Sequence, residues 1–241
     1  MVLTNRKEIR VCYLCGRVLD GDLSDDHVPP KQLYAKGIRI KHNPNLLTIP
    51  VHAECNRAYQ HDEDYFVYSM SAFAVKTYSG KSVLADINRR YQNGEQQKLL
   101  IKTFREWEKR PSGLHLPSGK VVKRIEGKRI HRVAWKIVRG LFFYSEKRVL
   151  PESTPNSIEY VPPNTRPPDT FFVLNDSPNL GQYPGVFDYR YRQFQDVENM
   201  YYWALLFWDA FMILMAFHNP DCGCETCAKS RAPETETLVG N

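Results

Sequence analysis

Two stretches organise this chain: CYLCGRVLDGDLSDDHVPPK at residues 12–31 and NLLTIPVHAECN at residues 45–56. Each contains a pair of potential zinc ligands separated by two residues. Two pairs at this spacing can complete a tetrahedron around Zn²⁺ with three thiolates and one imidazole. The sequence therefore predicts a structural zinc site formed by Cys12, Cys15, His52 and Cys55.

A second set of polar residues is interleaved with the zinc pairs. Asp26 and His27 are adjacent in the first stretch, and Asn45 and Asn56 begin and end the second. Carboxylate and amide oxygens are hard ligands that suit Mg²⁺ or Mn²⁺ better than a second zinc ion. Taken alone, a histidine after an aspartate is more often a surface or hydrogen-bonded residue than a catalytic base.

Residues 11–73 resemble the HNH endonuclease family, in which a hairpin followed by a helix holds a catalytic metal ion. The order Cys-x-x-Cys, Asp-His, Asn-Leu, Cys-Asn carries the resemblance, which covers under a third of the chain. The more usual zinc-stapled members have cysteine at the position of His52, and many have histidine at the position of Asn56. Imidazole binds zinc and amide oxygen binds magnesium, so the chain is similar to an Asn-ended variant.

The resemblance implies metal-assisted hydrolysis of phosphodiester bonds on a ββα-metal fold. His27 would be the general base that activates water, because imidazole exchanges a proton near neutral pH. Asp26 and Asn56 would hold one Mg²⁺ or Mn²⁺ ion against the scissile phosphate. Asn45 would brace the loop that orients His27, with Asn43 as a nearby competitor for that role.

A helix is expected over about residues 53–75, and its polar face would include Asn56. Acidic residues lie one or two turns further along. Asp62, Glu63 and Asp64 could supplement the metal site or simply cap and solvate the helix. The second role is expected for Asp62, and the role of Asp64 is left open. His61 is expected to lie on the solvated helix surface, with metal binding as the alternative.

Residues 76–148 form a basic centre, with 19 lysine and arginine residues against 6 aspartate and glutamate residues. Such an excess is typical of a phosphate-binding surface. Within it, residues 128–144 predict an amphipathic helix. Four cations lie largely off its apolar stripe and are expected to contact the backbone of nucleic acid, with DNA favoured over RNA; a solvated or membrane-facing helix is the alternative. These are Arg129, Arg132, Lys136 and Arg139.

The rest of the chain predicts a Pro-rich loop and then a small antiparallel sheet. Strands are expected at residues 170–174 and 187–194, followed by a hairpin of residues 203–208 and 211–218. The fold class is α+β, an HNH-like module followed by basic helices and this sheet. The expected regions are 1–75 (HNH-like module), 76–150 (basic and mainly helical), 151–168 (Pro-rich loop or linker), 169–220 (β) and 221–241 (tail).

A second group of soft ligands follows the expected hairpin: His218, Cys222, Cys224 and Cys227. Four such residues within ten positions could bind a second zinc ion. Free thiols or redox crosslinking are the alternative, because the spacing of the cysteines is irregular.

The bulk properties are those of a soluble globular protein, with 42% hydrophobic and 25% charged residues. The grouped cysteines favour metal binding in a reducing cytoplasm over a disulfide framework. We expect no membrane association, because Asp209 interrupts the apolar residues 201–217 and the N-terminal residues lack the apolar run of a secretion signal. The leading function is a metal-dependent endonuclease. The alternative is a zinc-stabilised nucleic-acid-binding or interaction protein without cleavage activity. The oligomeric state is left open.

Overall fold

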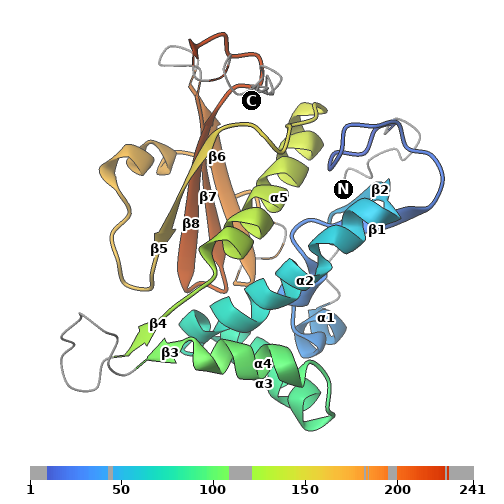
Figure 1. Ribbon diagram of the computed structural model, residues 1–241. Helices are drawn as coiled ribbons and strands as arrows, with labels where there is room; N and C mark the ends of the chain where they lie inside the picture. Colours follow the sequence, from blue (N-terminus) through green and yellow to red (C-terminus); the bar gives the residue numbers. More distant parts are fainter. Residues whose placement is uncertain are drawn as a thin grey trace, which may run out of the picture.

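The computed structural model describes residues 10–42, 46–108, 121–181, 183, 185–194, 200–225 and 227. The fold is mixed α+β, with helices and small antiparallel sheets (Figure 1). Within these ranges, no helix has both the length and the apolar character needed to cross a bilayer. Asn45 and Asn43, the two candidates for bracing the His27 loop, lie outside the described residues.

A two-stranded antiparallel sheet precedes a long helix in the first third of the chain. Strand β1 (Leu23–His27) pairs with β2 (Thr48–His52). The connection contains the short helix η1 (Lys31–Leu33) and helix α1 (Lys36–His42). Helix α2 (Ala53–Met70) begins directly after β2, close to the start that the sequence predicts. Its amino-terminal turn therefore lies beside the paired strands.

Short elements surround the far end of α2. The turn η2 (Ser71–Ala74) ends it and leads into α3 (Tyr78–Gln92) and α4 (Gln97–Arg105). Thr77 caps α3, because its side chain accepts a hydrogen bond from the Gly80 amide. A two-stranded ribbon of β3 (Trp107–Glu108) and β4 (Val122–Lys123) follows.

A four-stranded antiparallel sheet forms the other side of the molecule, with strand order β5–β8–β7–β6. Its strands are β5 (Asn156–Val161), β6 (Phe187–Gln193), β7 (Met200–Phe207) and β8 (Phe211–His218). Strand β7 alternates between buried and half-buried residues, as expected of a strand with one face against the core. The β7–β8 hairpin and the strand β6 confirm the sequence-based prediction for these segments.

Helix α5 (Gly127–Glu146) lies between this sheet and α2 (Figure 1). Its aromatic side chains meet those of the sheet edge-on, with ring centroids 5.2 Å apart for Trp135 and Phe217 and 5.3 Å apart for Phe142 and Tyr201. One continuous apolar core includes Tyr13 near the amino terminus and Trp203 in the sheet. The central helix therefore joins the regions that the sequence divides.

Two expectations for the second half of the chain were wrong. Residues 170–174, expected as a strand, belong to the 3₁₀ helix η3 (Asp169–Leu174). Pro167 and Pro168 precede this helix, and the Pro168 carbonyl accepts its first hydrogen bond, from the Phe171 amide. In addition, the stretch expected as a Pro-rich loop, residues 151–168, contains the edge strand β5. An edge strand tolerates flanking prolines because one of its sides makes no ladder hydrogen bonds.

Candidate functional site

The first Cys/His cluster joins the loop after Val11 to the start of α2. The ligand atoms of Cys12, Cys15, His52 and Cys55 all lie within 4.8 Å of one another, so this cluster could hold a metal such as zinc. His52 Nδ1 is 3.4 Å from Cys15 Sγ, and His52 Nε2 is 3.0 Å from the Val18 carbonyl oxygen. A contact at the second nitrogen fixes the ring with Nδ1 toward the sulfurs, as is common for metal-binding histidines.

The thiols of this cluster differ in acidity. Although burial opposes it, hydrogen bonding to Arg17 and His52 lowers the pKa of Cys15 to about 6. Burial and the neighbouring thiols of Cys15 and Cys12 raise the pKa of Cys55 to about 12. A low thiol pKa favours the thiolate, which is the form that binds zinc.

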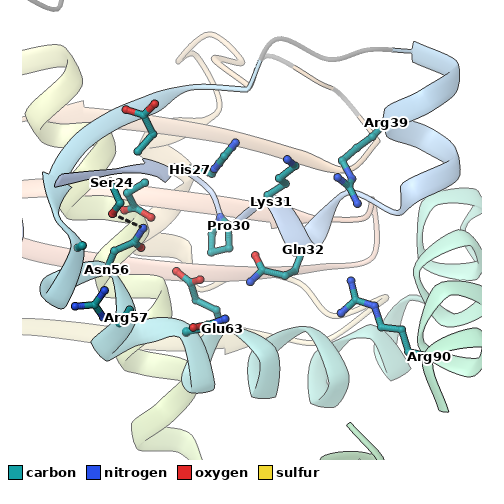
Figure 2. Close-up of a pocket in the computed structure, with 14 residues that line it drawn as sticks. Ser24, His27, Pro30, Lys31, Gln32, Arg39, Asn56, Arg57, Glu63 and Arg90 are labelled. Carbon is teal, nitrogen blue, oxygen red and sulfur yellow. Dashed lines mark hydrogen bonds between the residues drawn. The ribbon is translucent and has the colours of Figure 1, made fainter. Parts of the chain in front are cut away.

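A pocket of about 420 Å³ opens between β1, the turn that follows it and α2 (Figure 2). Asp26, His27 and Asn56, three residues that the sequence singles out, all line it. Figure 2 shows His27 on one side of the hollow and Asn56 on the facing side, with Glu63 two turns further along α2. The antiparallel pair and the following helix therefore bring the adjacent residues Asp26 and His27 to one pocket with Asn56 and Glu63 from a later part of the chain.

His27 is the last residue of β1 and is half-buried at the pocket wall. Its pKa lies below the ordinary value, first because of burial and then because of the Lys31 cation. The imidazole is therefore neutral near pH 7 and can accept a proton.

Asp26 is 3% exposed and lines the pocket. One of its carboxylate oxygens accepts a hydrogen bond from the Tyr13 hydroxyl, and the other is 2.6 Å from Lys136 Nζ. The same ammonium group contacts the carboxylate of Glu63. Two buried carboxylates thus share one cation. Each carboxylate oxygen has more than one lone pair, so these contacts do not exhaust the capacity of the two carboxylates as ligands.

Asn56 and Glu63 come from one face of α2, since they are seven residues apart. The side-chain amide nitrogen of Asn56 donates to Ser24 Oγ at 3.1 Å, which orients the amide and lets its oxygen act as a ligand. The sequence offered Asp62, Glu63 and Asp64 as carboxylates that could supplement the site, and of these three the pocket is lined by Glu63. Helical periodicity counted from Asn56 favoured Asp64 or Glu63, and the spacing of seven residues selects Glu63.

Four cations line the same pocket. The sequence analysis assigned none of the four to this site, although Arg90 belongs to the basic centre of residues 76–148 that was expected to bind phosphate. Arg57 lies at one end of the hollow, Lys31 on its wall, and Arg39 and Arg90 at the other end (Figure 2). The side chains of Lys31 and Arg57 are exposed to solvent. They come from the turn after β1, α1, α2 and α3, so no single stretch of sequence contains a recognisable basic motif.

The cations that the sequence selected on α5 are engaged inside the molecule. Lys136 and Arg139 are 1% and 2% exposed, so neither can reach a phosphate on the surface. Arg139 donates instead to backbone carbonyl oxygens, including that of Leu14 at 2.7 Å. Both Arg129 and Arg132 contact Asp62, each with a nitrogen to oxygen distance of 2.6 Å. The expected phosphate-binding face of this helix was wrong for its two buried members, and the other two are ion-paired.

Asp62 therefore has a different role from the one expected. It was predicted to cap or solvate α2, and it instead joins α2 to α5 through its two arginine partners. Tyr59 and Tyr65 on α2 add to this junction, because the Arg132 and Arg129 guanidinium groups lie 4.2 Å and 4.3 Å from their ring centroids. The charges of this surface of α5 hold two helices together.

The remaining site prediction concerns the segment after β8. The ligand atoms of His218, Cys222, Cys224 and Cys227 also lie within 4.8 Å of one another. This second cluster could likewise hold a metal such as zinc.

Comparisons with protein-family models, with curated proteins and with solved structures found no match to this chain.

Proposed function

We propose that this protein is a metal-dependent endonuclease of the HNH type that hydrolyses phosphodiester bonds in nucleic acid, with DNA as the favoured substrate. The observation that supports it best is that Asp26, His27 and Asn56 line one open pocket. Asp26 and His27 lie on β1, which pairs with β2, and Asn56 lies in the first turn of α2, which supports this proposal.

His27 is assigned the role of general base. A neutral imidazole can take a proton from water as the water attacks phosphorus, and the lowered pKa of His27 keeps the ring neutral at physiological pH. The pocket is open to solvent at this position, since the imidazole is only half-buried. Water and a phosphate group can therefore reach it.

Oxygen donors in the pocket fit a hard divalent ion. Asp26 and Asn56 would hold Mg²⁺ or Mn²⁺, and Glu63 offers a second carboxylate on the same face of α2. When bound, such an ion would stabilise the negative charge that develops on the phosphate and the leaving oxygen. Lys136 keeps the Asp26 and Glu63 carboxylates in place, because its ammonium group contacts both.

The substrate backbone would lie along the rim cations, a term we use for Lys31, Arg39, Arg57 and Arg90. They surround the pocket on both ends, which suits a strand that enters at one end and leaves at the other. Contacts of this kind position the phosphates and do not read the base sequence.

Zinc in the first Cys/His cluster would hold the start of α2 in place beside the site. Cys55 is followed directly by Asn56, so a metal ion on Cys55 and His52 would hold the first turn of α2. A closed set of four protein ligands is typical of structural zinc. Its role would be to position Asn56.

A zinc-stabilised nucleic-acid-binding protein without cleavage activity is the second candidate. The contact of Lys136 with Asp26 and Glu63 favours it, because a cation already neutralises part of the negative charge that would attract a divalent ion. Both candidates predict nucleic-acid binding, so only cleavage distinguishes them.

The test is nicking of supercoiled plasmid and of RNA with added Mg²⁺ or Mn²⁺ by the native chain, His27→Ala and His61→Ala. His61 is an exposed histidine of α2 outside the pocket and is the matched control. We expect His27→Ala to lose roughly 10²- to 10⁴-fold in rate and His61→Ala to cut as the native chain does. The melting temperatures of the variants check that both are folded.

The outcomes separate the candidates. If the native chain cuts neither substrate under any divalent ion, the binding protein is correct. If His27→Ala cuts as fast as the native chain, His27 is not the base, and the site must be assigned to other residues.

A further inference from the structure

The second Cys/His cluster lies at the end of the four-stranded sheet where strand β8 ends. His218 is the last residue of β8, and the three cysteines follow within nine residues. In Figure 1 this segment lies at the end of the sheet opposite the β3–β4 ribbon. None of the four residues lines the pocket of the proposed active site.

The distances around His218 match a tetrahedral metal site. His218 Nδ1 is 3.3 Å from Cys222 Sγ and 3.2 Å from Cys224 Sγ, and all four donor atoms lie within 4.8 Å of one another. Zinc–sulfur and zinc–nitrogen bond lengths place neighbouring donors of a tetrahedron roughly 3.5–3.8 Å apart. A modest adjustment of the side chains would therefore bring the four donors to a zinc ion.

Hydrogen bonds in the turn after β8 bring Cys222 back toward His218. The Cys222 amide donates to the Asn219 carbonyl oxygen at 2.8 Å, and the Asp221 amide donates to Asn219 Oδ1 at 3.1 Å. Arg148, which follows α5, contacts Asp221 at 2.6 Å. This turn is therefore held both by its own hydrogen bonds and by the end of the central helix.

The donor set points to zinc rather than to a disulfide. None of the three cysteines forms a disulfide in the described part of the chain, and an odd number of thiols cannot all pair with one another. Cys222 and Cys227 are 8% and 5% exposed. Buried thiols that converge on an imidazole nitrogen match the Cys₃His sites of structural zinc.

We propose that His218, Cys222, Cys224 and Cys227 bind a second, structural Zn²⁺ that fastens the segment after β8 to the end of the sheet. All four positions would be filled by protein ligands, so this ion would hold the chain and perform no chemistry. The second site would share no ligand with the first, and either ion could be removed without the other.

The test measures zinc in the purified chain of 241 residues by elemental mass spectrometry. We expect about two equivalents per chain, about one for Cys222→Ser/Cys224→Ser, and about one for the matched variant Cys12→Ser/Cys15→Ser. The proposal is overturned if Cys222→Ser/Cys224→Ser retains the zinc content of the native chain. It is also overturned if the native chain holds about one equivalent that Cys12→Ser/Cys15→Ser abolishes.

A second measurement on the native chain keeps the test valid if a variant fails to fold. Iodoacetamide labelling followed by peptide mass spectrometry reports each thiol separately. We expect Cys222, Cys224 and Cys227 to resist labelling until a chelator is added. Labelling at the same rate with and without chelator would refute the site, and so would protection that a reducing agent removes and a chelator does not.

Discussion

Two groups of cations in this molecule have the same formal charge and opposite surroundings. On α5, Lys136 and Arg139 are buried and their nitrogens contact protein oxygens. At the pocket, Lys31 and Arg57 are exposed, and a guanidinium nitrogen of Arg57 lies 3.7 Å from a carboxylate oxygen of the exposed Asp22. A local excess of lysine and arginine in a sequence therefore does not identify a surface that binds an anion.

The difference arises from where the acidic residues lie. The basic centre has few carboxylates of its own, and the fold brings others to it from distant parts of the chain. Asp26 and Asp62 come from the amino-terminal third and Asp221 from the segment after β8, and each contacts a cation of residues 129–148. These contacts neutralise cations of α5 and of the residues just after it inside the protein, whereas Lys31 and Arg57 at the pocket are exposed.

Removing the buried cation should give the largest effect. In Lys136→Met the side chain keeps its approximate length, but Asp26 and Glu63 become two unpaired buried carboxylates. We expect the free energy of unfolding to fall by about 3–5 kcal/mol, measured by urea denaturation. The matched control is Lys102→Met, which removes an ion pair to Glu126 in which both side chains are about half exposed. The free energy of unfolding of this control should fall by at most about 1 kcal/mol.

Equal destabilisation of the two lysine variants would contradict this distinction. It would mean that the ion pairs of Lys136 contribute no more than a surface pair. The contrast between buried, ion-paired cations and exposed cations would then not describe a real difference in energy.

The second-largest expected effect is a difference in nucleic-acid affinity between variants of the rim cations and variants of the α5 cations. Lys31→Gln/Arg57→Gln removes two rim cations, and Arg129→Gln/Arg132→Gln removes two ion-paired cations from α5. The formal charge change is the same. We expect the rim variant to weaken binding of a duplex about 10-fold or more at moderate salt, and to reduce the slope of log affinity against log salt by about one for each phosphate that is no longer neutralised. The α5 variant should change the affinity much less.

Fluorescence anisotropy across a salt series measures both quantities. If the α5 variant weakens binding as much as the rim variant does, long-range charge governs binding and the pocket does not. If neither variant changes the salt slope, no phosphate lies against these residues.

The sequence could predict what depends on local pattern. The paired ligands of the zinc cluster, the helix that follows His52 and the β7–β8 hairpin are all encoded by spacing within a few residues, and they are present in the structure. The alternation of aromatic and polar residues likewise located β6. Each of these features requires no knowledge of distant contacts.

The missed features depend on tertiary contacts. The amphipathic pattern of α5 separates apolar from basic residues, but it cannot show that Glu63 and the Leu14 carbonyl oxygen lie against Lys136 and Arg139. The rim cations come from four separate elements and meet only after folding. The prolines on both sides of β5 led to the prediction of a loop over residues 151–168. An edge strand also tolerates nearby proline, so this pattern alone could not distinguish a strand from a loop.

The smallest expected effect is a difference in cleavage rate between variants of two adjacent carboxylates of α2, Glu63 and Asp64. Glu63 lines the pocket, whereas Asp64 lies on another side of the helix, where Gln96 Nε2 is 3.4 Å from its Oδ2. Glu63→Gln should therefore reduce cleavage, and Asp64→Asn should leave the cleavage rate unchanged. A marked fall in cleavage by Asp64→Asn would instead make Asp64 part of the site.

Asp64→Asn should still alter the pH dependence of stability. Burial raises the pKa of Asp64 above its ordinary value of 3.8, with Arg90 and His61 opposing the shift. The folded state therefore binds this proton more tightly than the unfolded state does. The native chain loses stability as pH rises through the folded pKa, because a buried carboxylate then becomes charged. Asparagine removes that loss, so the stability of the variant relative to the native chain should be higher at about pH 7 than at about pH 4. Urea denaturation at the two pH values gives this difference. A difference of the opposite sign would mean that the contacts of the charged carboxylate outweigh its burial, and that Asp64 is one more carboxylate stabilised by neighbouring cations.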